Sequence, residues 1–143
     1  DIARHGAVTD QYIIIEDLFP TILEMAGVKS YNVVQEVDGK SFTSVLKNPD
    51  YSDTTRALIW HFPNKWIPED RPGINYKSAL RQGKCMLIYN IKSYIGETRD
   101  LSALYPRKTK ELSSVLSNQL RRWKSAMPYY KVSGEVVPLA DKR

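Results

Sequence analysis

Residues 107–127 limit the possible folds more than any other part of the sequence. Their apolar side chains recur every three or four positions, the spacing of one face of an α-helix, while charged residues occupy the other side. The apolar positions are Leu112, Val115, Leu116, Leu120, Trp123 and Met127. A face of this kind is far more often packed on a core than left open as a groove for a partner. We therefore predict a long helix with a core beneath it.

Two segments with strand-like composition precede this helix. Residues 56–62 (RALIWHF) predict one strand, and residues 76–91 (YKSALRQGKCMLIYNI) predict a hairpin that turns at Gln82-Gly83. A Pro-rich loop separates them. The expected fold class is therefore α+β, with a small antiparallel sheet and the long C-terminal helix packed on one face. The tail, residues 128–143, is broken by Pro and Gly and is expected to lie on the surface or to be mobile.

A shorter helical pattern in residues 16–28 (EDLFPTILEMAGV) does not fit this α+β unit. Asp17 is the predicted N-cap, Pro20 falls in the first turn, and Gly27 ends the helix. A strand or extended segment is expected just before it, over residues 8–15. The apolar face needs a partner surface: Leu18, Ile22, Leu23 and Ala26. The pattern therefore indicates the last strand and helix of a different domain.

The charge and cysteine content exclude several classes of protein. Lys and Arg outnumber Asp and Glu by 21 to 16, but the basic residues are scattered, so no nucleic-acid partner is expected. No apolar run is long enough for a membrane span. The single cysteine, Cys85, rules out an internal disulfide, and its apolar surroundings predict a buried thiol rather than a nucleophile. The two histidines lack metal-ligand spacing, so no metal site is expected.

His61 is the residue with the best claim to a functional role. It ends a predicted strand and precedes a long loop that contains Asn64 and Lys65, a position from which a side chain can contact a ligand. The alternative is a packed histidine that is hydrogen-bonded to the backbone. The sequence has no Gly-x-Ser-x-Gly, P-loop or Gly-x-Gly-x-x-Gly motif. We therefore predict no catalytic residue in this chain.

Five segments, in this order, resemble the C-terminal portion of type I sulfatases. They are EDLFPTILEMAGV, VDGKSFTSVLK, RALIWHFP, SALRQGKCMLIYN and GETRDLSALYPRKTKELSSVLSNQLRRW. The likeness runs from about residue 8 to about residue 127 and is greatest to bacterial arylsulfatase-like enzymes that act on sulfated glycans. It implies an alkaline-phosphatase-like α/β catalytic domain followed by a subdomain with a four-stranded antiparallel sheet and a terminal helix.

The resemblance also implies a division of the chain. Residues 1–28 would be the end of the catalytic domain, residues 29–55 connecting loops with a short helix, residues 56–127 the C-terminal subdomain, and residues 128–143 a tail. After Asn90 the family usually has a further strand before the stretch that begins here at Gly96. Either this protein lacks that fourth strand, or the tip of a hairpin is missing from the chain. The second explanation is favoured, because loss of a strand would expose the apolar face under the helix.

The function implied by the resemblance is that of a segment of a sulfuric ester hydrolase. Similar enzymes use a formylglycine, made within a Cys/Ser-x-Pro-x-Arg motif, and a calcium ion, and this chain does not contain that motif. The segment would then complete the substrate cleft without being catalytic by itself. His61, Asn64 and Lys65 are the predicted substrate-binding residues.

The partners implied are an upstream catalytic domain and a sulfated carbohydrate or aryl sulfate. A homo-oligomer is a further possibility. Export to the periplasm or the cell exterior is expected from the family. The alternatives to an enzyme segment are a freestanding module that binds anionic glycans and a purely structural domain.

Overall fold

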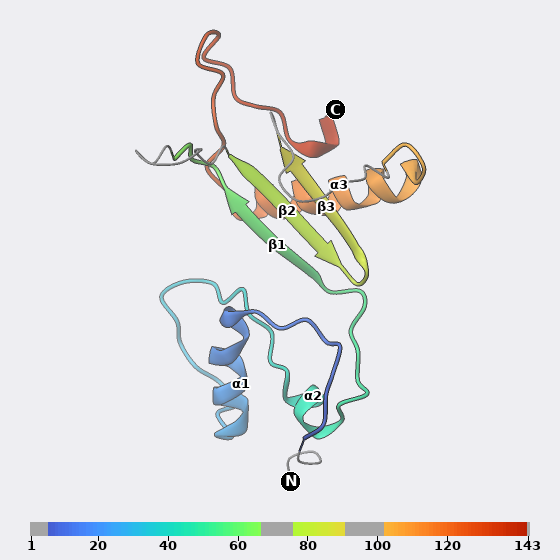
Figure 1. The fold of residues 1–143 in the computed structure, drawn as a ribbon. Helices are drawn as coiled ribbons and strands as arrows, with labels where there is room; N and C mark the ends of the chain where they lie inside the picture. Colours follow the sequence, from blue (N-terminus) through green and yellow to red (C-terminus); the bar gives the residue numbers. More distant parts are fainter. Residues whose placement is uncertain (1–5, 67–75, 91–101, 143) are drawn as a thin grey trace. The chain divides into compact units, whose positions relative to one another are not determined.

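A computed structural model describes residues 6–66, 76–90 and 102–142. The chain divides into two compact units, residues 1–53 (unit 1) and residues 54–143 (unit 2), and each is described by itself. Figure 1 shows the elements. Unit 1 contains the 3-10 turn η1 (Ile15–Asp17) and helices α1 (Leu18–Met25) and α2 (Thr43–Lys47). Unit 2 contains strands β1 (Ala57–Phe62), β2 (Lys77–Gln82) and β3 (Cys85–Asn90), helix α3 (Pro106–Arg122) and the 3-10 turn η2 (Ala140–Lys142).

The sheet of unit 2 has the order β1-β2-β3, and both neighbouring pairs are antiparallel. Gln82 pairs with Cys85, so β2 and β3 are joined by the two-residue turn Gly83-Lys84. Gly83 has a φ of +53°, which a glycine adopts without a steric penalty and which suits tight hairpins. The predicted hairpin is confirmed, with its turn one residue later than expected.

Helix α3 covers one face of this sheet (Figure 1). Its predicted apolar face is confirmed: Leu112, Leu116 and Leu120 are buried, and Val115, Trp123 and Met127 pack against them. From the sheet, Leu80 is fully buried in the same cluster, and Ala57, Ile59 and Leu87 line it. Pro106 stands at the start of the helix, where its missing N–H costs no intrahelical bond. The predicted α+β class, with an antiparallel sheet and a helix on one face, is therefore observed.

The end of the tail also reaches this core. Val137 and Ala140 are buried. The Arg121 guanidinium donates to both carboxylate oxygens of Asp141, at 2.8 and 2.6 Å, and this contact lowers the pKa of Asp141. The Asp141 N–H donates to the hydroxyl of Ser117, which is buried on α3. The end of the tail thus packs against the helix, while residues 131–136 are exposed, as predicted for a surface segment.

The described residues of unit 2 form three strands, with one isolated bridge between Tyr129 and Val136. The predicted fourth strand falls between Asn90 and Gly96, and residues 91–101 lie outside the described residues. The fourth strand and the alkaline-phosphatase-like context therefore stay predictions.

In unit 1, Asp17 corrects the predicted helix cap. Its side chain makes no capping bond to α1; instead its carboxylate accepts the N–H of Ile14 at 3.0 Å and of Lys40 at 2.9 Å. A capping side chain reaches back to its helix from an extended backbone, whereas Asp17 is the last residue of η1 and is itself helical (φ −73°, ψ −21°). The carboxylate therefore points toward the N–H groups of the chain before α1 and of the loop at Lys40.

The hydrophobic residues of unit 1 are mostly exposed. Residues 8–14 form no strand, although the backbone is extended at Ile14, and Val8 and Ile13 are exposed. Helix α1 ends at Gly27 as predicted, with a φ of +74°. Its exposed large side chains are Leu18, Phe19, Ile22 and Met25. Of the face that the sequence predicts to need a partner, Leu18, Ile22 and Ala26 are exposed and Leu23 is half-buried.

Candidate functional site

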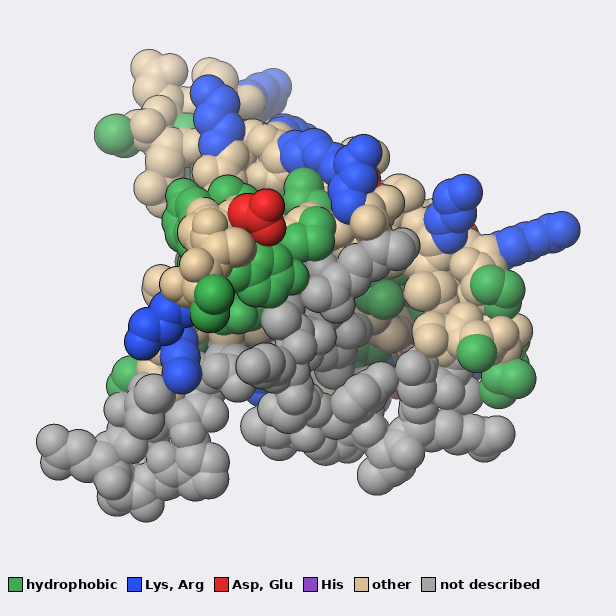
Figure 2. All heavy atoms as spheres, turned by 90° about the horizontal axis from the view of Figure 1, so that it is seen from above, with side chains coloured by type: hydrophobic (Ala, Val, Ile, Leu, Met, Phe, Trp, Pro, Cys, Tyr) green, Lys and Arg blue, Asp and Glu red, His purple; other side chains and the backbone are tan. Residues whose placement is uncertain are grey.

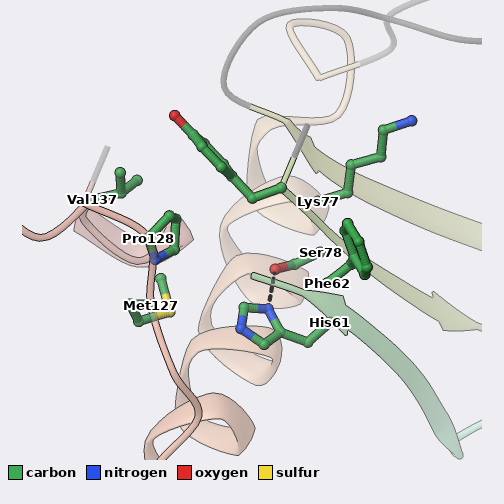
Figure 3. Close-up of a pocket in the computed structure, with 8 residues that line it drawn as sticks. His61, Phe62, Lys77, Ser78, Met127, Pro128 and Val137 are labelled. Atoms are coloured by element: carbon green, nitrogen blue, oxygen red, sulfur yellow. Dashed lines mark hydrogen bonds between the residues drawn. The ribbon is translucent and has the colours of Figure 1, made fainter. Parts of the chain in front are cut away.

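His61 lies in β1 and links three segments of unit 2. The β1–β2 register places it opposite Ser78, and its Nδ1 is 2.8 Å from the Ser78 Oγ. Its Nε2 is 2.7 Å from the carbonyl oxygen of Ala126, in the segment that follows α3. Figure 3 shows the imidazole between Ser78 and the Met127–Pro128 segment. The histidine therefore ties two strands to the end of the helix.

These contacts determine which nitrogen carries the hydrogen when the His61 ring is neutral. A carbonyl oxygen can only accept, so Nε2 carries the hydrogen and donates it to Ala126. Nδ1 then accepts from the hydroxyl of the buried Ser78. Both ring nitrogens thus have a protein partner, as the packed alternative requires. To bind a substrate through either nitrogen, His61 would have to give up one of these bonds, and its substrate role stays a prediction.

A small hollow adjoins this histidine (Figure 3). It is lined by His61, Phe62, Tyr76, Lys77, Ser78, Met127, Pro128 and Val137. Its interior holds about one water molecule, which is far less than the volume of a sugar ring. The hollow is therefore a site for a solvent molecule or a small group, and a glycan would contact only its rim.

Asn64 and Lys65 lie just beyond the end of β1, and both are exposed. Neither is among the residues that line the hollow. The structure thus does not bring the three predicted substrate-binding residues into one pocket. It places His61 in a packed position and the other two on the surface after the strand.

Cys85 corrects a second prediction. It is exposed, whereas its apolar neighbours predicted a buried thiol. It follows the hairpin turn directly and pairs with Gln82 at the end of the sheet, while Leu87, two residues on, packs on the core. A residue at the rim of a sheet can lie on the core-facing side and still extend beyond the helix that covers it.

Ser78 and Ala126, the two partners of His61, carry little signal in the sequence. Ser78 is a small polar residue in an ordinary strand, and Ala126 contributes only its backbone carbonyl. The alternation of β2 could have placed Ser78 on the core-facing side, but pairing it with His61 requires the β1–β2 register.

Within residues 6–66, 76–90 and 102–142, no group of three or more His, Cys, Asp or Glu side chains is arranged to hold a metal ion. In those same ranges, no helix combines the length and the apolar character needed to cross a bilayer.

Figure 2 shows how charge is distributed on one face of the molecule. The Lys and Arg side chains visible there are spread between polar and hydrophobic ones. This distribution agrees with the scattered basic residues of the sequence and its formal charge of +5.

The chain is similar in sequence to a known protein. No family model matches the chain. The chain is 33% identical over 136 residues to a protein named Sulfatase from Formosa agariphila, and the match covers 85% of this chain and 25% of that protein. The chain thus spans about a quarter of the length of this relative. The match confirms the resemblance carried by the five motifs, and the chain is accordingly related to one segment of a sulfatase.

Proposed function

We propose that this chain acts as the C-terminal segment of a sulfuric ester hydrolase, where it completes the substrate cleft and contributes specificity contacts. The observation that carries the proposal is the match to a quarter of a protein named Sulfatase. The fold agrees with it in coarse outline, since unit 2 has the small antiparallel sheet and packed helix expected of the subdomain.

The open face of α1 supports an upstream catalytic domain as the partner. Leu18, Phe19, Ile22 and Met25 give a short helix several large exposed hydrophobic side chains. Several large exposed hydrophobic side chains on one short helix are more typical of an interaction site than of free surface. Under the proposal, this face packs on an alkaline-phosphatase-like domain, to which residues 1–28 would belong.

The chemistry is proposed to reside in that upstream domain. The chain carries no Cys/Ser-x-Pro-x-Arg sequence from which a formylglycine could be made. The formylglycine and a calcium ion would thus be supplied by the upstream domain. Export from the cytoplasm is proposed because similar sulfatases are usually exported. The present segment would be inactive alone.

Substrate recognition is proposed to involve the end of β1. Lys65 offers an exposed positive charge to a sulfate group, and Asn64 offers an exposed amide. His61 would support this edge of the sheet through Ser78 and Ala126, and would reach substrate only at the rim of the hollow.

Hydrolysis of an aryl sulfate in the presence of calcium tests the proposal. The chain alone is expected to show only background turnover. A chimera in which this chain replaces the matching quarter of the Formosa agariphila protein is expected to keep any aryl sulfatase activity of that protein, and deletion of that quarter is expected to abolish it. Turnover by the isolated chain, or full activity after the deletion, would contradict the proposal.

The second candidate function is a freestanding module that binds anionic glycans. The net charge of +5 and the exposed Lys65 favour it over a purely structural domain. Binding of heparin-type glycans by this chain, lost on Lys65→Gln together with His61→Ala, would favour this candidate. A chain that neither binds glycans nor supports hydrolysis in the chimera would be a structural domain.

A further inference from the structure

The sheet of unit 2 has a second face, opposite α3. Because side chains alternate along a strand, the neighbours of the core-facing Ile59, His61 and Leu80 point to the other side. The register of the three strands brings the following side chains together there: Leu58, Trp60, Phe62, Lys77, Ala79, Arg81 and Met86. We call these seven residues the outer face.

Two aromatic rings dominate the exposed part of the outer face. Trp60 and Phe62 are 45% and 39% exposed, although they belong to a strand whose Leu58 is buried. They stand two residues apart, about 7 Å along the strand, which is comparable with the length of one sugar unit in a glycan chain. Trp60 lies opposite the small Ala79, so no large cross-strand neighbour covers that flank of the indole.

A cation accompanies the rings. Lys77 lies directly opposite Phe62, and in the described part of the chain no carboxylate forms an ion pair with it. Figure 3 shows Phe62 and Lys77 on the side away from the His61–Ser78 pair. Arg81 is on the same face, and none of the seven residues is acidic. The outer face therefore combines exposed aromatic surface with the ammonium group of Lys77.

We propose that the outer face binds a sulfated oligosaccharide. Trp60 and Phe62 stack on the apolar C–H faces of successive sugar rings, and Lys77 pairs with a sulfate group of the same chain. A sugar ring has an apolar face and a polar edge, which suits an exposed aromatic ring, while a sulfate ester is anionic at all physiological pH values. The ligand class rests on the function proposed above, whereas the aromatic and cationic arrangement stands on the geometry.

A glycan fits this surface better than an apolar protein partner. A protein that covered Trp60 and Phe62 with hydrophobic side chains would also remove Lys77 from water, and an ammonium without a partner is costly to bury. A sulfated glycan supplies the anion and leaves the rim hydrated. Asn64 and Lys65 follow Phe62 within three residues, so the outer face would extend the predicted substrate contacts along the sheet.

The test is a binding titration of the full 143-residue chain by calorimetry. The probes are hexasaccharides from a sulfated galactan, a sulfated fucan and heparin, each with its desulfated counterpart, and inorganic sulfate alone. Trp60→Ala is expected to weaken binding of the best sulfated probe and of its desulfated counterpart by about tenfold or more, as for an aromatic anchor. Phe62→Ala should act in the same direction. Lys77→Gln is expected to weaken only the sulfated probe and to reduce the salt dependence.

Matched controls come from the same unit. Tyr129→Ala removes an exposed aromatic ring, and Lys110→Gln removes an exposed cation on α3. Both are expected to leave the affinities within twofold of the unchanged chain. Melting curves check that each variant is folded, and Lys77→Gln keeps the test decisive if an aromatic variant unfolds.

Three results would overturn the inference. They are no binding of any hexasaccharide, equal losses in the control and outer-face variants, or an unchanged glycan affinity in Trp60→Ala while association with a catalytic domain is lost. The last result would identify the outer face as a protein interface. The outcome of the hydrolysis assay is independent of this titration. Glycan binding through Trp60 without hydrolysis in the chimera would refute the proposed function and leave this inference standing.

Discussion

The two units of this protein differ in what they bury. In unit 2 the buried side chains are mainly aliphatic, and one cluster of them, from β2, α3 and the end of the tail, surrounds Leu80 and Leu116. In the described part of unit 1, the buried residues are Asp17, Thr21 and Thr43, with Val45 as the single buried hydrophobic residue. Unit 2 is therefore organised by hydrophobic burial, and unit 1 by hydrogen bonds.

The hydrogen bonds of unit 1 connect α1 to the loop before α2. The hydroxyl of Thr21 donates to the Asp17 carbonyl and accepts the N–H of Phe42, while the Asp17 carboxylate accepts the N–H of Lys40. Each such bond contributes only about 0.5–1.5 kcal/mol net, because water competes for the same groups. The large apolar side chains of α1 add little while they are exposed. This difference indicates that the exposed hydrophobic side chains of unit 1 are suited to packing on a partner surface that is not part of unit 1.

The largest effect is expected from Leu116→Ala in unit 2. Leu116 is fully buried at the centre of the core, so the lost contacts and the cavity should lower the free energy of unfolding by about 2–5 kcal/mol. All three tryptophans, Trp60, Trp66 and Trp123, belong to unit 2, so urea unfolding followed by tryptophan fluorescence reports on this unit. The matched control is Leu104→Ala, which removes the same atoms from an exposed position. Equal effects of the two changes would show that the core is not centred on α3.

An intermediate effect is expected from Asp17→Ala in unit 1. The change leaves the N–H groups of Ile14 and Lys40 without their acceptor, at a cost of about 1–3 kcal/mol. Hydrogen exchange at the Lys40 amide should accelerate, while the tryptophan-monitored unfolding of unit 2 should not change. The exposed Asp10→Ala serves as control. A matching loss of stability in unit 2 would mean that the two units unfold together.

The smallest effect is expected from Ile22→Ser on α1. Ile22 is 62% exposed, so its replacement should change the stability of this chain by no more than about 0.5 kcal/mol. Val45→Ser, at the buried hydrophobic residue of unit 1, should cost clearly more. Hydrogen exchange of α1 amides compares the two variants. If Ile22→Ser is as damaging as Val45→Ser, the α1 face already packs within unit 1 and needs no outside partner.

The fold of unit 2 was largely predictable because its signals are local and periodic. The helical spacing from Leu112 to Trp123 predicted both α3 and the side that it buries, and the Gly83 turn predicted the β2–β3 hairpin. The tail was not predictable in the same way. Ala140 is an apolar residue in an aperiodic stretch, and only its packing with the leucines of α3 shows that it belongs to the core.

The candidate site was less predictable, since each of its contacts joins residues far apart in the chain. His61 was identified from its position at a strand end, yet its partners Ser78 and Ala126 depend on strand register and on the path of the chain after α3. Asp17 was mispredicted as a helix cap for the same reason. Its carboxylate accepts the N–H of Lys40, which is 23 residues away in the chain.

The sequence was enough to establish the α+β class, the core-facing side of α3 and the likeness to a sulfatase segment. These follow from periodicity and from the order of motifs, which are properties of neighbouring residues. The three-dimensional structure was needed to show that both nitrogens of His61 have protein partners, that Cys85 is exposed, and that Trp60, Phe62 and Lys77 share one face. Those facts depend on register and on long-range packing, where one residue of shift would turn each side chain to the opposite face.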